Sequence, residues 1–224
     1  FSQTVANAKC LAEKIGCEYT ASTEGIYRAD IYISALKDSV ATDVWSKINF
    51  NDKLLLHTSG SLSIELLKEH STNYGVIYPL MTLSKDRVIP FDDIPILVEG
   101  NTSHNEKTIE SLARQISSNI TIVNSTQRSQ LHLAAVWANN FSNHMYAVAK
   151  QITDENNLPF SILLPLIDET AKKVHNLEPK DAQTGPAIRY DKNIIDKHIA
   201  ANAAEYRDLY KLISESIHKL AIKK

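Results

Sequence analysis

The sequence predicts an α/β domain with a mainly parallel sheet, followed by an all-helical domain. Up to residue 123, short apolar runs rich in β-branched residues alternate with helical patterns. This alternation indicates βαβ units, because parallel strands need a crossover segment between them. Beyond residue 123 only helical patterns follow, and no proline or glycine occurs before Pro159. We therefore expect a boundary near Asn124, between domains at 1–124 and 125–224.

The first domain is expected to alternate helices with strands. The expected helices cover residues 4–15, 38–48, 63–69 and 103–117, and the expected strands cover residues 18–20, 30–36, 53–57, 74–78, 94–99 and 120–123. Gly16 is typical of a helix C-cap, and Ser103 with Glu106 matches a capping box at the start of the last helix. The right-handed crossover rule then favours a doubly wound sheet.

The second domain is expected to contain only helices and loops. One helix of roughly 30 residues over 126–157 comes first. A second helix follows over 160–176, with a kink expected at Pro165. After a loop at 178–190, two further helices are expected over residues 191–203 and 204–222.

Composition excludes several classes of protein. Lys+Arg 24 against Asp+Glu 26 leaves no basic excess for a nucleic-acid surface. No apolar run approaches the roughly 18–20 residues of a membrane span. Cys10 and Cys17 match neither a disulfide framework nor a C-x-x-C motif, so we expect reduced thiols in a cytoplasmic protein and no metal site.

The carboxyl ends of the expected strands hold the first candidate site, because open α/β sheets bind ligands there. The segment His57-Thr58-Ser59-Gly60-Ser61 brings an imidazole and three hydroxyls to one such end. Another strand ends at residues 34–38, where small residues precede a helix whose N-terminal amides could face a phosphate. Tyr78-Pro79-Leu80 ends a third strand. Each segment could equally be an ordinary connecting loop.

The long helix of the second domain carries two stripes at about 100° per residue. Apolar positions form one arc: Leu131, Ala134, Ala138, Phe141, Met145 and Ile152. A neighbouring polar arc carries Arg128, His132, Ala135, Asn139 and Asn143. This polar arc could face water, another subunit or an interdomain cleft. In a cleft, Arg128 could hold an anion and His132 could move a proton.

A third candidate is the turn at residues 183–191, where Thr184 and Arg189 flank Gly185 and Pro186. This turn could complete a pocket, or it could be an ordinary loop between helices.

Five segments in order carry a resemblance to a known family. They are residues 56–62 (LHTSGSL), 78–80 (YPL), 98–101 (VEGN), 131–140 (LHLAAVWANN) and 184–186 (TGP). They resemble a bacterial family of Rossmann-like proteins with a helical C-terminal domain of unknown function. Its members are described as NADP oxidoreductases related to pyrroline-5-carboxylate reductase and to deazaflavin-dependent NADP reductases.

The resemblance implies that a first βα unit, with its glycine-rich turn, is missing in front of Phe1. The content of only 6 glycines, where average usage gives roughly 16, agrees with this expectation. Ser2, Gln3 and Thr4 would then follow the second strand and contact the cofactor. They include neither the Arg that meets the 2′-phosphate of NADP nor the acidic residue expected for NAD. NADP or NAD is therefore expected, with NADP preferred by resemblance.

The resemblance also implies roles for the candidate residues. Ala35, Leu36, Thr58, Ser59 and Gly60 would border the cofactor, with His57 beside the nicotinamide as a possible proton carrier. His132 would be the acid or base and Asn139 a hydrogen-bonding orienter. Arg128, which stands where the family commonly has Lys, would anchor the substrate together with Thr184 and Gly185.

Two functions follow as hypotheses. The first is an NAD(P)-dependent oxidoreductase that transfers a hydride to or from a small, anionic carbonyl or imine substrate, as a homodimer through its C-terminal helices. The second is a non-catalytic nucleotide-sensing or scaffolding dimer that keeps the fold. A small-molecule binding protein without nucleotide is a third reading.

Overall fold

The computed structural model describes residues 1–85 and 87–223. The chain divides into two compact units, Phe1–Met145 and Tyr146–Lys224. We describe each by itself. The predicted boundary near Asn124 lies directly before the long helix, which starts at Ser125, and the division into domains at 1–124 and 125–224 stays a prediction.

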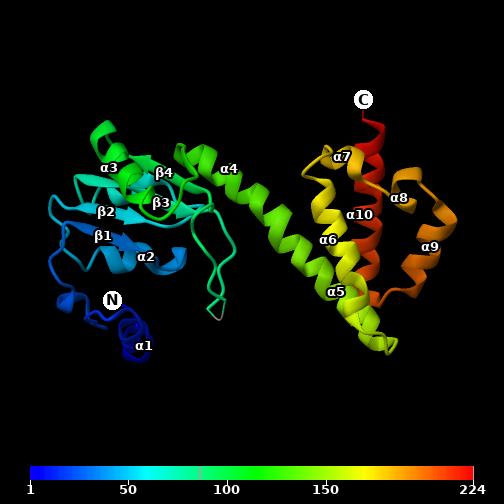
Figure 1. Cartoon of the computed structure of the whole chain (residues 1–224), viewed down its shortest axis with the longest axis horizontal. Helices are drawn as coiled ribbons and strands as arrows, with labels where there is room; N and C mark the ends of the chain where they lie inside the picture. Colours follow the sequence, from blue (N-terminus) through cyan, green and yellow to red (C-terminus); the bar gives the residue numbers. More distant parts are fainter. Residues whose placement is uncertain (86, 224) are drawn as a thin grey trace. The chain divides into compact units, whose positions relative to one another are not determined.

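The first unit is built on a five-stranded sheet in which the strands follow one another in sequence order (Figure 1). The strands are β1 (Ile31–Ser34), β2 (Leu54–His57), β3 (Asn73–Pro79), β4 (Ile96–Gly100) and β5 (Ile120–Ile122). The pairs β1–β2, β2–β3 and β4–β5 are parallel, whereas β3 and β4 are antiparallel. The predicted class, a mainly parallel Rossmann-like sheet followed by helices, is confirmed.

Helices cover both faces of this sheet. Helix α3 (Ser103–Ala113) packs Ile109 and Ala113 on one face, and α2 (Asp38–Trp45) packs Ala41 and Trp45 on the other. In Figure 1 the two helices lie on opposite sides of the strands. The approach of α3 is close, since a Cβ on Gly75 would lie 2.3 Å from Ile109 Cδ1.

Several predictions about the first unit need correction. Residues 18–20 form no strand, because Thr20 Oγ1 accepts from the Ser22 N–H and donates to the Ser22 carbonyl, which favours a local turn over sheet pairing. The helix expected at 63–69 is a short 3-10 turn, η2 (Ile64–Leu67). The cap of α3 is Thr102, whose Oγ1 accepts from Asn105 N–H, and Ser103 is already helical.

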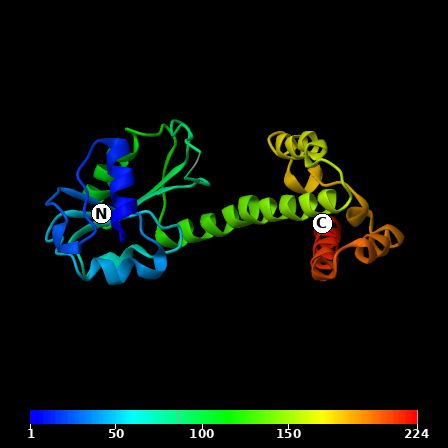
Figure 2. The same ribbon diagram turned by 90° about the horizontal axis from the view of Figure 1, so that it is seen from below.

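The other helices and the strands of this unit lie close to the ranges expected from the sequence. Helix α1 (Val5–Ile15) begins after the Thr4 cap and ends at Gly16, which has a φ of 69°. A 3-10 turn, η1 (Thr23–Gly25), precedes β1. The connection between β3 and β4 extends away from the sheet in both views (Figures 1 and 2).

The long helix contains a feature that the sequence pattern did not reveal. Helix α4 (Ser125–Ala135) continues through the π-helical segment η3 (Val136–Phe141) into α5 (Ser142–Glu155). A π turn holds one more residue than an α turn, so it rotates every later position by about 100°. The predicted polar arc across this segment, from Arg128 to Asn143, is therefore wrong, and so is the matching apolar arc.

The second unit contains the rest of α5 and further helices. These are η4 (Phe160–Leu163), α6 (Leu164–Lys173), α7 (Pro179–Ala182), α8 (Pro186–Arg189), α9 (Lys192–Ala201) and α10 (Ala204–Ile222). Pro165 lies in the first turn of α6 and causes no kink, because the first turn needs no N–H donor from it. The predicted loop at 178–190 contains α7 and α8. No helix in the described part of the chain is long and apolar enough to cross a membrane.

Candidate functional site

The carboxyl ends of β1, β2 and β3 meet at one edge of the sheet, the edge where open α/β folds bind ligands. Three connections start there: residues 35–38 after β1, residues 58–61 after β2 and Leu80 after β3. The first two turns of α4 lie against this part of the first unit through Arg128 and His132. The candidate site is formed by these connections and by α4.

Gly60, Tyr78 and His132 form the centre of the site. The Tyr78 hydroxyl lies 3.1 Å from His132 Nδ1. Gly60 is buried beneath the same imidazole, and a Cβ at this position would lie 2.6 Å from His132 Nδ1. Only glycine leaves room for the imidazole in this position, so the turn after β2 determines where His132 lies.

Asp38 contacts the same turn through its carboxylate. Its Oδ2 accepts hydrogen bonds from Ser59 Oγ at 2.9 Å and from Ser61 Oγ at 2.5 Å. Ser59 Oγ in turn accepts from the backbone N–H groups of Ser61 and Leu62. The two serines that flank Gly60 thus hold an exposed carboxylate at the start of α2. That carboxylate lies at the helix N-terminus whose amides, in one reading of the sequence, could face a phosphate.

Tyr78 keeps its proton in this environment. Partial burial raises the pKa of the Tyr78 hydroxyl, and the nearby Asp38 charge raises it further. A raised pKa means that the phenol stays protonated at neutral pH. Tyr78 can therefore donate a hydrogen bond to His132 Nδ1.

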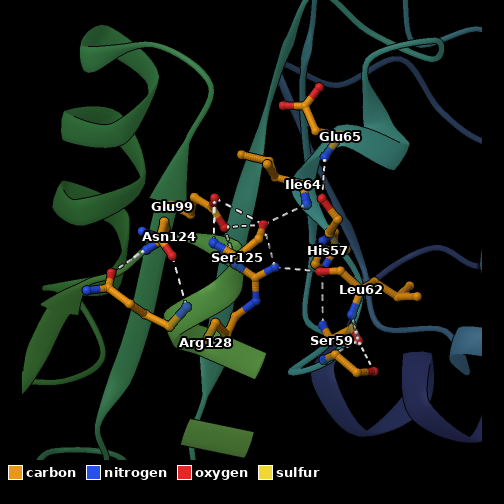
Figure 3. A network of polar contacts seen from close by, with 12 residues as sticks. His57, Ser59, Leu62, Ile64, Glu65, Glu99, Asn124, Ser125 and Arg128 are labelled. Atoms are coloured by element: carbon orange, nitrogen blue, oxygen red, sulfur yellow. Dashed lines mark hydrogen bonds and ion pairs between the residues drawn. The ribbon is translucent and has the colours of Figure 1, made fainter. Parts of the chain in front are cut away.

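Arg128 is at the centre of a buried polar network between α4, β4 and the turn after β2 (Figure 3). Its guanidinium forms an ion pair with Glu99 and donates to the Leu62 carbonyl and to Ser125 Oγ. Glu99 also accepts from the Ser125 N–H at 2.9 Å. The exposed fraction of Arg128 is 0%. Its Nη1 and Nη2 donors thus point to protein acceptors, while its buried Nε has no hydrogen-bond partner among the described residues. The predicted contact of Arg128 with a substrate has no support in this geometry.

His57 lies beside the same network, also buried. In the sheet, His57 on β2 pairs with Val76 on β3, and Val76 pairs with Glu99 on β4. One residue of the sheet thus separates His57 from Glu99. Its Nδ1 accepts from Ser59 N–H at 3.1 Å, and the Trp45 ring stacks on the imidazole. Burial and then the Arg128 charge lower the pKa of His57 to about 4, against the weaker opposing effects of Asp38 and the Ser63 backbone. His57 is therefore neutral at pH 7 and holds the turn in place.

The other predicted site residues are spread over the chain. Ala35, Leu36 and Thr58 lie at the strand ends beside the site, and Thr58 N–H donates to the Ser34 carbonyl. Thr4 caps α1. Ser2 and the exposed Gln3 precede that helix.

Two groups of predicted residues lie away from the strand ends in sequence. Asn139 is exposed within η3. Thr184 and Gly185 belong to the second unit, where Gly185 has a φ of 104° before α8. Among the described residues, no group of three or more His, Cys, Asp or Glu side chains is placed to hold a metal.

The sequence interpretation gave no role to Asp38, Tyr78 or Glu99. Tyr78 and Glu99 belong to segments that carry the family resemblance, and Asp38 begins a helix at a strand end. The signal in the sequence that could have identified them was a charged or phenolic side chain close to the end of an expected strand. The contacts that give these residues a role come from chain segments that are distant in sequence.

Comparison with known proteins agrees with this architecture. A family model described as a domain of unknown function, DUF2520, matches residues 94–217. A crystal structure from Bacteroides fragilis, provisionally assigned as an NADP oxidoreductase, is similar to the chain at 42% identity and a TM-score of 0.90, covering 97% of this chain and 86% of that one. No curated protein matches.

Two more distant structures share the fold. A reductive aminase from Aspergillus terreus in complex with NADPH and ethyl-5-oxohexanoate is 15% identical, with a TM-score of 0.67 over 97% of this chain and 84% of that one. An imine reductase from Myxococcus stipitatus in complex with NADP⁺ is 16% identical, with a TM-score of 0.60 over 97% of this chain and 82% of that one.

The fold is thus that of the Rossmann-like oxidoreductases with a helical C-terminal part. Within that class, the chain belongs to the DUF2520 family. The resemblance inferred from the five sequence segments is confirmed.

Proposed function

We propose that the protein is an NAD(P)-dependent oxidoreductase that transfers a hydride to or from a small carbonyl or imine substrate. The observation that carries the proposal is the Tyr78–His132 pair, 3.1 Å apart, at the edge of the sheet where this fold binds ligands. The similarity to the Bacteroides fragilis structure assigned as an NADP oxidoreductase supports it. The NADPH and NADP⁺ complexes of the two distant neighbours agree with it.

The strand ends fit a nicotinamide cofactor. Ala35 after β1 and Thr58, Ser59 and Gly60 after β2 are small, so a flat ring could approach the backbone there. Ala35, Leu36, Thr58 and Ser59 would border it. When bound, the nicotinamide supplies or accepts the hydride. The 224 residues contain no G-x-G-x-x-G turn for the pyrophosphate.

The chain itself supplies the proton transfer. A carbonyl oxygen that becomes an alkoxide needs a proton, and the protonated Tyr78 hydroxyl can donate one. His132 Nδ1, within hydrogen-bond distance of that hydroxyl, can accept or return the proton. The buried, neutral His57 is not suited to this role. Asn139, Thr184 and Gly185 keep their predicted roles as proposals, whereas Arg128 becomes a residue that positions α4.

A nucleotide titration followed by proton-transfer variants tests the proposal. We expect fluorescence titration to give micromolar binding of NADPH or NADH. With a substrate found by screening small ketones and imines, Tyr78→Phe and His132→Ala should each lower kcat for a ketone by about 10²-fold or more. His104→Ala, an exposed histidine on α3, is the control and should keep full turnover.

Two results would contradict the proposal in different ways. A folded protein that binds neither nucleotide would favour the non-catalytic scaffold. Full turnover by His132→Ala with bound nucleotide would leave the oxidoreductase standing and remove His132 from proton transfer.

A further inference from the structure

The charges near the Tyr78–His132 pair do not suit an anionic substrate. Arg128 is fully buried, and Glu99 compensates its charge within the same network. A buried cation whose charge is paired with a neighbouring carboxylate attracts an anion only weakly from the site. The predicted anchor for an anionic group is thus not available.

Asp38 carries the opposite charge and is accessible. Both serine hydroxyls converge on its Oδ2, and among the described residues no hydrogen bond to Oδ1 is found. Neighbouring Lys37 forms no ion pair with it in the described part of the chain. The carboxylate is therefore exposed and not compensated by a cation.

The turn around Gly60 ties Asp38 to the reactive pair. Ser59 and Ser61 bond the carboxylate, and Gly60 between them lies against His132, which contacts Tyr78. Asp38 and His132 therefore border the same three-residue turn. The effect of the Asp38 charge on the pKa values of both Tyr78 and His57 agrees with this closeness.

We propose that the site selects a positively charged substrate, an iminium ion or a protonated amine, through the Asp38 carboxylate. This inference rests on the proposed oxidoreductase function, and within the carbonyl and imine classes it selects the substrates that carry a positive charge. A carboxylate next to a cationic nitrogen gives a charge-assisted hydrogen bond, which is stronger than a neutral one. Because Asp38 is exposed, water weakens the attraction, and we expect a preference of about tenfold.

Three ring compounds of similar size and different charge provide the test. Pyrrolidine is cationic at neutral pH, cyclopentanol is neutral, and cyclopentanecarboxylate is anionic. Their dissociation constants are measured by calorimetry on the full-length protein, with and without NADP⁺. We expect pyrrolidine to bind about tenfold tighter than the other two. Added salt should reduce this preference.

Two variants assign the preference to one carboxylate. Asp38→Asn removes the charge and keeps an oxygen acceptor for the two serines. In this variant pyrrolidine should bind no more tightly than the other two compounds. Asp43→Asn on the same helix removes an equal charge from another exposed position and should leave the preference unchanged. Circular dichroism verifies that each variant is folded.

The outcomes separate the two proposals. Equal binding of the three compounds, no binding of pyrrolidine, tighter binding of the carboxylate, or a preference that survives in Asp38→Asn would each overturn the cation inference. Failure to bind either nucleotide would instead overturn the proposed function. The charge preference measured without NADP⁺ can be judged in either case.

Discussion

The two units of the chain differ in how they bury apolar side chains. The first unit has one compact apolar cluster on each face of its sheet, with residues such as Leu55, Leu56 and Ile109 fully buried. In the described part of the second unit, the buried hydrophobic residues are Ala187 and Ile195. A parallel sheet covered by helices on both faces makes its own core, whereas a few amphipathic helices leave much of their apolar surface in water.

Two ion pairs, one from each unit, differ in the same way in how deeply they are buried. In the first unit, Arg128 and Glu99 pair inside the fold, with side-chain exposures of 1% and 12%. In the second unit, Lys150 and Asp154 pair on the surface of α5, with exposures of 58% and 57%. A buried pair depends on both partners, because either charge alone would remain without water, whereas an exposed pair contributes little. The same kind of contact therefore has different consequences in a buried and in an exposed position.

The largest expected effect comes from breaking the buried pair. Arg128→Met should lower the free energy of unfolding by about 3–5 kcal/mol, because Glu99 is left nearly buried and unpaired. Urea unfolding followed by tryptophan fluorescence measures this, since Trp45 and Trp137 both belong to the first unit.

The exposed pair is the matched control for this prediction. Lys150→Met should change the free energy of unfolding by about 0.5 kcal/mol or less, followed by circular dichroism. Similar losses in the two variants would refute the contrast between the units.

A smaller effect should come from acid. The pKa of His57 is about 4 in the folded protein, against 6.5 for an ordinary histidine. Between these values the unfolded chain binds a proton that the folded protein does not. Stability is therefore complete above pH 6.5, and falls by up to about 3 kcal/mol as the pH drops towards 4.

His57→Asn identifies the residue responsible for this pH dependence. Urea unfolding at several pH values should show a shallower loss of stability below pH 6.5 in the variant than in the unchanged protein. An equal slope in both proteins would mean that another group causes the dependence.

The smallest effect on stability is expected at the exposed leucines of the second unit. Leu166 on α6 and Leu212 on α10 are 64% and 63% exposed. Leu166→Lys with Leu212→Lys should change the free energy of unfolding by only about 0.5 kcal/mol at low protein concentration. If the predicted homodimer forms through these helices, sedimentation should show weaker association, with Ser216→Lys as the control.

Two results would contradict the role expected for these two leucines. A large loss of stability in the diluted double variant would mean that these leucines belong to a core within one chain. Unchanged association would place the predicted dimer contact elsewhere on the chain.

Much of the first unit could be predicted from local patterns. The strand from Leu54 to His57 is a continuous apolar run, and Gly16 ends α1 as a C-cap. Errors arose where polar side chains compete for the backbone, as at Thr20, and where one position decides the cap, as at Thr102. Pro165 was misread because proline is favourable in a first helical turn and unfavourable further on.

The candidate site could be predicted only in part. Because open α/β sheets bind ligands at the carboxyl ends of their strands, the turn around Gly60 could be predicted as part of the site. His132 could be predicted from the polar residues of the long helix. Arg128 on α4 is buried together with Glu99 on β4. The periodicity of one helix cannot reveal a partner on a strand. The π turn after Ala135 was also hidden, because its extra residue leaves the composition of the helix unchanged.

Gly60 and His132 share one small volume, although they are far apart in the sequence. Their substitutions should therefore be interdependent. Gly60→Ala alone would push the imidazole away from Tyr78, whereas the same alanine would fit if a smaller residue replaced His132. The residue after the end of β2 and the residue on α4 are therefore coupled in one direction: a side chain at position 60 requires a smaller residue at position 132.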